Sequence, residues 1–321
     1  MTADLSEPNS RNPQCVLILA GTTASGKTDV SIPLAEILKG EIVNADSRQI
    51  YRELHIGTAK PSPKQLAHVP HHFIDEKSIT ERWTAGDFAR AARDQIALIF
   101  ERNSIPILVG GSMLYIKALT DGFYEMDELD SSDYYALRQE AEQTGWETLY
   151  AELQERDPEL AAQTDPHDGH RILRGLAVSR NRQQRLSDLQ QQPRAAMPWP
   201  FRLYFLHGDR QQTYERVNRR VIEMIEAGLV EEVRGLANQG FDEHNCNALR
   251  THGYQEVFPY LRGEISQDEM IEKIQQAVRH YVKRQMTWFR HDERAIWIHR
   301  DFQTPPESIA EQIAADFRAS I

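Results

Sequence analysis

One eight-residue segment near the start of this chain restricts its possible folds more than any other feature. Residues 21–28 read Gly-Thr-Thr-Ala-Ser-Gly-Lys-Thr, a complete G-x-x-x-x-G-K-[ST] phosphate-binding loop. The glycines allow a tight turn whose N–H groups point at phosphate oxygens, and the next helix adds the positive end of its dipole. Lys27 supplies a mobile charge and Thr28 a hydroxyl suited to Mg²⁺. The apolar run at 15–20 predicts the buried parallel strand that must precede such a loop.

Strand and helix patterns alternate through the first 120 residues, as in a parallel α/β sheet. We expect a helix from Lys27 to about Leu38, and short strands at 41–45 and 105–109. Thr84 and Asp87 have the spacing of a capping box, which predicts a further helix behind them. Residues 121–200 lack strand character: an acidic stretch, short polar helices and a Gln/Pro-rich linker follow one another.

Strand character returns at 203–206, followed by a helix from about Arg210 to Ala227, with Gly228 as its expected end. A long helix at 267–290 and a strand at 295–298 complete the pattern. The predicted fold class is α/β, a parallel sheet core like that of P-loop NTPases with helices on both faces. The core spans 14–120 and 201–321, an all-helical insertion domain spans 121–200, and 1–13 form a disordered N-terminus.

Charge is distributed unevenly along the chain. A net charge of −11 argues against indiscriminate nucleic-acid binding. Residues 170–220 nevertheless contain eleven arginines and only three acidic residues, a local net charge of +8. Such a run is usually a solvated helix face, but arginine enrichment in an acidic chain favours a phosphate-rich partner.

Composition also indicates where the protein works. Two cysteines, Cys15 and Cys246, provide neither a disulfide framework nor metal-site spacing, so we expect a reducing, cytoplasmic location. The polar first residues do not resemble a signal peptide, and no apolar run is long enough to cross a bilayer, so no membrane association is expected. No protein partner is implied.

A phosphate-binding loop alone suggests an ATPase, a GTPase or a kinase, but the sequence offers few of the further motifs that these enzymes need. The guanine-reading Asn-Lys-x-Asp is absent from the sequence. The strand at 105–109 ends in Gly-Gly-Ser, where an ATPase usually has an acidic residue. Asp46 is the acid that ends a core strand, one strand after the loop, which places a carboxylate beside bound phosphates.

The motifs together resemble those of the tRNA dimethylallyltransferase (tRNA isopentenyltransferase) family, in family order and over about residues 14–300. The family's Pro after the first loop glycine is replaced by Thr22, and its usual Thr by Ser112, which keeps the hydroxyl. The blocks that carry the resemblance, besides the loop, are Asp46–Tyr51, Ile56–Pro61, Pro70–Asp75, Leu108–Tyr115 and Gly253–Glu256.

The resemblance implies that the loop binds the diphosphate of dimethylallyl diphosphate rather than ATP. An adenine amine would attack the allylic carbon, and prearranged cations would stabilise the departing diphosphate. Arg220 matches the family arginine assigned to the diphosphate, although by itself it reads as a surface helix residue. Mg²⁺ would be held by Thr28. The implied diphosphate-binding residues are Gly21, Thr22, Thr23, Ala24, Ser25, Gly26, Lys27 and Thr28.

The resemblance also makes Asp46 the general base that takes the amine proton, with Lys27, Thr28 and Arg220 as the other catalytic residues. The alternative reading of Asp46 is a helix cap. Thr23 could contact either substrate.

The second substrate implied by the resemblance is a tRNA anticodon stem-loop, whose adenine just 3′ of the anticodon must leave its stack to react. Arg171 and Arg174 lie one helical turn apart and can face one phosphate backbone, Gln49 suits an adenine edge, and Tyr254 could stack on a base or simply pack in the core. The implied tRNA-binding residues are Asp46, Ser47, Arg48, Gln49, Ser112, His170, Arg171, Ile172, Leu173, Arg174, Arg250, Thr251, His252, Gly253, Tyr254 and Gln255.

Alternatives remain open at this point. Prenyl transfer to free adenine nucleotides is one, but the arginine-rich insertion argues against it because a mononucleotide needs no stem clamp. A P-loop small-molecule kinase and a non-enzymatic RNA-binding module are the others. The pair His71 and His72 suggests a metal site, yet no Cys or acid at zinc spacing accompanies it, which favours a loop pair with ordinary hydrogen bonds.

Overall fold

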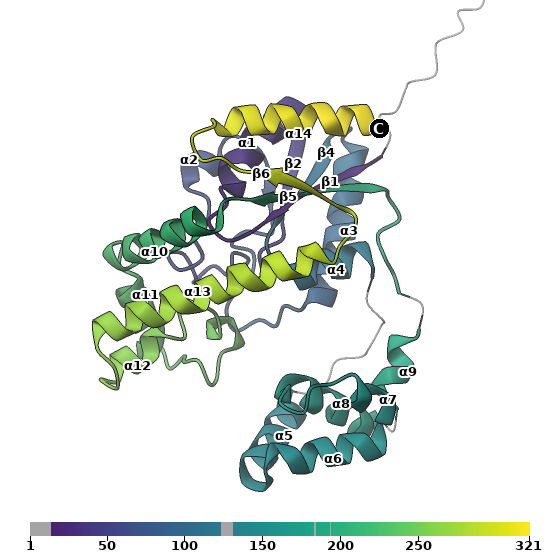
Figure 1. Ribbon diagram of the computed structural model, residues 1–321, viewed down its shortest axis with the longest axis vertical. Coiled ribbons are helices and arrows are strands. Elements are labelled where there is room, and N and C mark those ends of the chain that lie inside the picture. The colour runs from purple at the N-terminus through teal and green to yellow at the C-terminus, as the bar shows by residue number, and fades with distance from the viewer. Residues whose placement is uncertain (1–13, 123–130, 183, 193) are drawn as a thin grey trace, which may run out of the picture. The chain divides into compact units, whose positions relative to one another are not determined.

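A computed structural model describes residues 14–122, 131–182, 184–192 and 194–321 (Figure 1). The expected disordered N-terminus at 1–13, and residues 123–130 of the acidic stretch, lie outside these residues. By their contacts, the described residues form two compact units: 120–197 is one, and the rest of the chain on either side is the other. The boundaries expected from the sequence, at 121 and 200, lie close to these.

The larger unit is built on a six-stranded sheet in the order β3-β2-β4-β1-β5-β6, and every neighbouring pair is parallel. The parallel α/β sheet expected from the sequence is therefore confirmed. The central strand β1 is buried along its whole length. The strands are β1 (Val16–Gly21), β2 (Gly40–Asn44), β3 (His71–His72), β4 (Ile105–Gly110), β5 (Phe201–His207) and β6 (Ala295–His299).

Helices cover both faces of this sheet (Figure 1). On one face, side chains of α1 and α14 pack in one cluster with alternate residues of β1, β4 and β5, among them Leu19 and Tyr204. On the other face, Phe205 packs against Phe289 of α13, with 4.5 Å between ring centroids. The helices of this unit are α1 (Lys27–Leu38), α2 (Pro63–Leu66), α3 (Ala85–Glu101), α4 (Met113–Thr120), α10 (Arg210–Glu226), α11 (Leu229–Asn238), α12 (Val257–Leu261), α13 (Gln267–Arg290) and α14 (Pro306–Ser320), with a 3₁₀ turn at Asn247–Leu249.

Two local signals in the sequence act as expected. Thr84 and Asp87 form a reciprocal capping box at the start of α3. Gly228 has a φ of 101° and separates α10 from α11, because glycine adopts this left-handed backbone without strain. Helix α11 begins directly after Gly228, and the sequence pattern does not predict this helix.

The smaller unit contains helices and no strands among its described residues, as expected for the insertion. Its core is formed by leucines of α6 and α8 with smaller contributions from the other helices. Asp157, completely buried, accepts hydrogen bonds from Leu160 N and Ser187 N and so joins two of the helices. Its helices are α5 (Ser131–Thr144), α6 (Trp146–Arg156), α7 (Pro158–Ala162), α8 (Gly169–Arg182) and α9 (Leu186–Gln190).

In the described parts of the chain, no helix is both long enough and apolar enough to pass through a membrane.

We expect Gly57→Ala to destabilise the larger unit, because a Cβ at this position would lie 2.4 Å from the ring of Tyr254, which is completely buried and cannot move aside. Overpacking of this kind costs about 1–3 kcal/mol of unfolding free energy, measurable by urea denaturation. Gly235→Ala in α11 is the matched control: its Cβ would meet nothing within 4 Å, so this variant should keep or slightly gain stability. Equal effects of the two substitutions would contradict the packing argument.

Candidate active site

The phosphate-binding loop connects the central strand β1 to helix α1, as its motif requires. Gly26, with a φ of 80°, is the residue before α1 and has no side chain to cap the helix, so the first N–H groups of α1 lack a capping acceptor. Ala24 is also left-handed, with a φ of 63°. A Cβ on Gly21 would lie 2.7 Å from Leu206 O, so only glycine fits against β5. The loop therefore has the backbone geometry of an anion site.

Three charged residues expected at the site lie within electrostatic reach of one another. Lys27 Nζ donates to Gly21 O (3.0 Å) and Thr22 O (2.8 Å). Burial lowers the pKa of Lys27 to about 8, while Asp46 raises it and Arg220 lowers it. Burial likewise lowers the pKa of Arg220, again opposed by Asp46. The structure thus brings Lys27, Asp46 and Arg220 together, although 193 positions separate the first from the last.

Asp46 follows β2 and begins the turn that leads away from the sheet. Its Oδ1 accepts hydrogen bonds from Arg48 N (2.9 Å) and Gln49 N (3.3 Å), so it does cap this turn. Capping fixes the carboxylate in place and is compatible with a chemical role. The residues after Asp46 form a turn rather than a helix, so the helix-cap reading is corrected to a turn cap, and the role of Asp46 as a base stays a prediction.

The end of β4 separates Asp46 from the phosphate-binding loop, because β4 lies between β1 and β2. A Cβ on Gly110 would lie 2.3 Å from Ala45 O, and one on Gly111 would lie 2.4 Å from Gln285 Nε2. The adjacent Ser112 hydroxyl accepts a hydrogen bond from Ser47 N (3.0 Å). Gly110 lets the chain leading to Asp46 approach closely, Gly111 makes room for Gln285, and Ser112 holds the Asp46 turn in place.

Two residues that the sequence did not single out hold the loop from outside. Arg216 Nε, on α10, donates to Ala24 O (3.1 Å), and its guanidinium lies 4.0 Å from the ring centroid of Phe302. Gln285, on α13, accepts a hydrogen bond from Thr23 N (2.9 Å). Arg216 stands one turn before Arg220 and could have been noticed by that spacing. Nothing in the local sequence marks Gln285.

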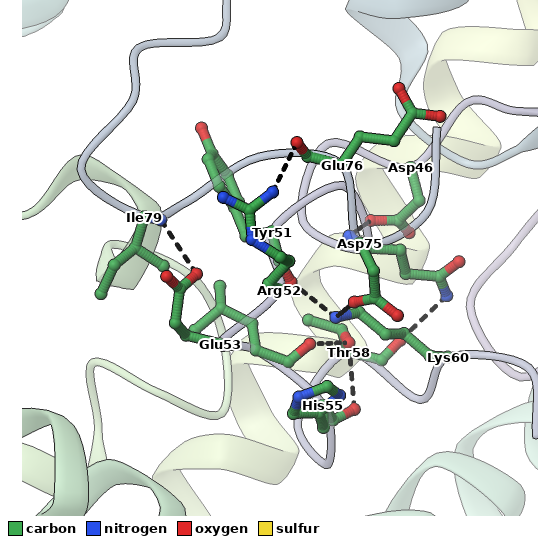
Figure 2. A network of polar contacts seen from close by, with 12 residues as sticks. Asp46, Tyr51, Arg52, Glu53, His55, Thr58, Lys60, Asp75, Glu76 and Ile79 are labelled. Carbon is green, nitrogen blue, oxygen red and sulfur yellow. Dashed lines mark hydrogen bonds and ion pairs between the residues drawn. The ribbon is translucent and has the colours of Figure 1, made fainter. Parts of the chain in front are cut away.

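The segment that follows Asp46 folds back on residues 75–79 through a polar network (Figure 2). Lys60 Nζ, on a side chain only 7% exposed, donates to Tyr51 O (2.5 Å) and to the Asp75 carboxylate. Arg52 donates to Glu76 O (2.7 Å), and Glu53 accepts from Ile79 N (3.0 Å). This network fixes the backbone of the segment that follows Asp46.

Gln49 belongs to the same network, which corrects one expectation. Its Nε2 donates to Thr58 O (3.0 Å) and Ala59 O (3.3 Å). An adenine edge needs the same amide donor. Gln49 therefore holds the loop in this structure, and its amide N–H groups are not available to the adenine edge that the sequence suggested.

Residues 250–255 lie beside α13. Burial, with Arg284 and Arg48, lowers the pKa of His252 to about 4, and its ring lies 5.1 Å from that of Tyr281. Arg250 Nε donates to Glu243 O (2.8 Å). Gly253 has a φ of 92°, and the amide of Gln255 donates to Glu256 Oε1 (3.0 Å). Thr251 O accepts from the N–H groups of Tyr254 and Gln255, which closes the turn.

Tyr254 does not present its ring to solvent. It is completely buried, and its hydroxyl donates to Glu232 (2.5 Å) and accepts from Gly57 N (3.2 Å). Of the two readings left open, the structure favours core packing, because a buried ring offers no face to a base.

In the helical unit, the predicted RNA-contacting residues fall into two groups. His170 and Arg171 are exposed at the start of α8, and Arg171 Nη1 donates to Gln163 O (3.2 Å). Arg174 follows one turn later and is partly exposed. Ile172 and Leu173 are 0% and 3% exposed and belong to the core. Direct contact of these two side chains with RNA is therefore excluded in this conformation, a correction that the alternation of apolar and basic residues along α8 explains.

The arginine run at 170–220 is divided between the two units. It crosses from the helical unit into the α/β unit at residue 198. Arg180 bridges Glu140 and Glu152, Arg185 pairs with Asp188, and Arg202 pairs with Asp316. The local sequence charge overestimated the positive charge available to a partner, because Glu140, Glu152 and Asp316 lie outside the run while Asp188 pairs within it.

His71 and His72 form the short edge strand β3 rather than a loop. His72 Nε2 lies 2.8 Å from Glu41 Oε2, which also pairs with Arg102, and His71 Nδ1 lies 2.8 Å from Val69 O. Among the described residues, no cluster of three His, Cys, Asp or Glu side chains could hold a metal ion.

The comparisons with known proteins agree with one another. A family model described as IPP transferase matches residues 49–292. The chain is 41% identical to the tRNA dimethylallyltransferase of Salinibacter ruber over 310 residues, which cover 96% of this chain and 93% of the relative. It is 42% identical to tRNA dimethylallyltransferase 1 of Syntrophotalea carbinolica over 292 residues, covering 90% and 92%.

Solved structures extend the likeness to the fold. The full-length tRNA isopentenylpyrophosphate transferase of Bacillus halodurans matches with a TM-score of 0.70 at 32% identity, over 95% of this chain and 97% of that one. A eukaryotic dimethylallyltransferase acting on tRNA matches with a TM-score of 0.79 at 25% identity, over 95% and 79%.

We expect Lys60→Met to loosen the segment that carries Asp46, because it leaves Tyr51 O and Asp75 without their shared cation. Since Asp75 is partly exposed, the loss of unfolding free energy should be about 1–3 kcal/mol, measured by urea denaturation. Amide hydrogen exchange should rise within 46–60. Lys64→Met, at an exposed site on α2, is the control and should change neither; equal exchange in the two variants would contradict this role for Lys60.

Proposed function

This chain belongs to the IPP transferase family, and from that premise we propose that it is a tRNA dimethylallyltransferase. It transfers the dimethylallyl group of dimethylallyl diphosphate to the exocyclic amine of the adenine immediately 3′ of the anticodon in tRNA. The observation that supports this most directly is the proximity of Lys27 and Arg220 to Asp46, because the reaction needs cations at a leaving group and a base at a nucleophile.

On this proposal the loop binds the donor's diphosphate. The N–H groups at the start of α1, with Lys27 and Arg220, face the negative charge that grows as the C–O bond to diphosphate breaks. Because these groups are fixed before reaction, little reorganisation is needed when the charge develops. Arg216 contributes by holding the loop through Ala24 O.

Mg²⁺ is the proposed cofactor, and the donor set fits it. Thr28 lies in the first turn of α1, and the described residues offer no cage of three acidic or His ligands. Mg²⁺ retains water and commonly binds through substrate phosphates with few protein ligands, so one hydroxyl beside a diphosphate suffices. When bound there, the ion neutralises diphosphate charge.

Asp46 is the proposed general base. The amine nitrogen forms a bond to the allylic carbon, the C–O bond to diphosphate breaks, and the amine proton passes to the Asp46 carboxylate. The hydrogen bonds from Arg48 N and Gln49 N hold this carboxylate in one orientation. Transfer of the dimethylallyl group therefore does not require a water molecule positioned for hydrolysis at the phosphate-binding loop.

The tRNA anticodon stem-loop is the proposed acceptor. His170, Arg171 and Arg174 in the helical unit are suited to the phosphate backbone, since guanidinium groups pair with phosphates. In the α/β unit, His252 lies within electrostatic reach of Arg48, whose N–H donates to Asp46. The net negative charge of the chain limits nonspecific RNA binding. Such an enzyme works in the cytoplasm, where its tRNA substrates are.

The function is tested with purified protein and donor labelled in its dimethylallyl group, offered unmodified tRNA, AMP and ATP side by side. Label should enter tRNA alone, at the adenine 3′ of the anticodon, with one diphosphate released per transfer. Label in AMP or ATP would instead establish a nucleotide prenyltransferase. Absence of transfer to any acceptor, with phosphate passing from ATP to a small molecule, would establish a kinase.

Asp46→Ala should lower the single-turnover rate of transfer by about 10²–10⁴ while leaving the tRNA dissociation constant near that of the wild type, because the base acts in the chemical step. Filter binding and rapid quench measure the two quantities. Asp94→Asn, an exposed carboxylate on α3, is the control and should transfer normally. A rate for Asp46→Ala within threefold of wild type would remove Asp46 from this role.

The pKa of Lys27 predicts a pH dependence of donor binding. Its folded pKa is lowered to about 8, so above that pH the site loses a positive charge and affinity for inorganic diphosphate should weaken, by about tenfold near pH 9. Lys27→Arg keeps its charge throughout. Calorimetric titration of both proteins between pH 7 and 9.5 measures their affinities for diphosphate. Because ionisation of the diphosphate affects both proteins equally, it cancels in the ratio of the two dissociation constants. Parallel curves of affinity against pH would show that Lys27 does not titrate in this range.

A further inference from the structure

Gln285 bridges two loops that are distant in the sequence. Its side chain is 1% exposed; Oε1 accepts a hydrogen bond from Thr23 N (2.9 Å) and Nε2 donates to Gly111 O (3.0 Å). Thr23 Oγ1 lies 3.5 Å from the same oxygen. The amide thus joins the phosphate-binding loop to the end of β4 inside the protein, where a hydrogen bond is strengthened by the low dielectric.

The packing around this amide is specific. A Cβ on Gly111 would lie 2.4 Å from Nε2, so glycine is needed for the amide to reach the carbonyl. Gly111 O also accepts from the hydroxyl of Tyr281 (3.1 Å), one helical turn before Gln285 on α13. Two side chains of one helix therefore hold the same peptide group.

The bridge continues to the Asp46 turn. Ser112 follows Gly111, and its hydroxyl accepts from Ser47 N, the neighbour of Asp46 (3.0 Å). A continuous path of covalent and hydrogen bonds thus runs from Thr23 through Gln285 and Gly111–Ser112 to Ser47. The path begins in the loop proposed for the leaving group and ends beside the proposed base.

We propose that Gln285 is a positioning residue for dimethylallyl transfer: it fixes the distance and angle between the diphosphate loop and Asp46. This inference rests on the proposed function. Gln285 touches neither substrate, because both ends of its amide are engaged by Thr23 and Gly111. The attacking amine and the departing diphosphate must be aligned on one carbon atom. A displacement of either group by about 1 Å can lower the rate about 100-fold.

The test uses the full-length chain with saturating donor, Mg²⁺ and unmodified tRNA in single-turnover measurements. Gln285→Ala should lower the rate constant about 100-fold with tRNA affinity unchanged. Gln275→Ala is the matched control on the same helix: Gln275 Nε2 donates to Asn218 O (3.2 Å), away from both loops, so this variant should transfer within twofold of wild type.

Gln285→Glu separates positioning from simple packing. The carboxyl group that this substitution introduces can accept from Thr23 N when ionised but cannot then donate to Gly111 O, whereas its protonated form can do both. Burial favours the protonated form as pH falls. The ratio of the Gln285→Glu rate to the wild-type rate should therefore rise at least threefold between pH 8 and pH 6, while the Gln285→Ala ratio stays constant.

The outcomes are distinguishable. If wild-type protein transfers label to tRNA but Gln285→Ala does so within twofold of its rate, or if the Gln285→Glu ratio is flat with pH, Gln285 has only a structural role and the inference is overturned. A lower melting temperature in Gln285→Ala with an unchanged rate overturns it as well. Wild-type protein that transfers nothing to tRNA refutes the proposed function instead.

Discussion

The organisation of the larger unit depends on keeping two cations and a carboxylate together at the carboxyl end of the sheet. Burial disfavours the charged forms of Lys27 and Arg220, and Arg220 adds to the cost of charging Lys27, so the pKa of each is lowered. Asp46 opposes this effect on both residues. A bound diphosphate would stabilise the charged forms of Lys27 and Arg220 more strongly than Asp46 does. The unfavourable electrostatic energy of the two cations therefore decreases when an anionic ligand binds.

Assembling these charges requires segments from both sides of the helical unit. Lys27 and Asp46 precede it, whereas Arg220 and the helix carrying Gln285 follow it. β5 returns the chain to the sheet directly beside β1, and Leu206 O accepts from Thr22 N at the loop. The insertion therefore leaves the core continuous, because the strand after it pairs with the strand before the loop. The helical unit has its own hydrophobic core, which is rich in leucines and packs separately from the core of the larger unit.

Local sequence signals predicted the elements that are determined locally. The apolar strands, the Thr84 capping box and the stop at Gly228 each depend on residues within a few positions of one another. The short strand β3 and helix α11 were not predicted, since pairing with β2 and packing create them. The same division holds in the site. Lys27 and Asp46 are recognisable from motifs, whereas Gln285 acquires its role from partners 262 and 174 positions away. Gln49 was expected to suit an adenine edge, and Tyr254 was left open between stacking on a base and core packing. Hydrogen bonds assign Gln49 to the loop after Asp46, and burial assigns Tyr254 to the core.

The end of β4 explains why this phosphate-binding loop serves a different reaction from hydrolysis. Nucleotide hydrolases usually place a carboxylate at the end of a strand near the loop. Here Gly110 occupies that end, and even a Cβ there would lie 2.3 Å from Ala45 O. The space that a side chain at 110 would need is filled by the backbone leading to Asp46. The carboxylate therefore comes from β2, one strand further from the loop, which leaves it separated from the phosphates by the width of β4. On the proposed roles, a carboxylate at that distance suits a nucleophile that attacks carbon beyond the diphosphate better than a water that attacks phosphorus.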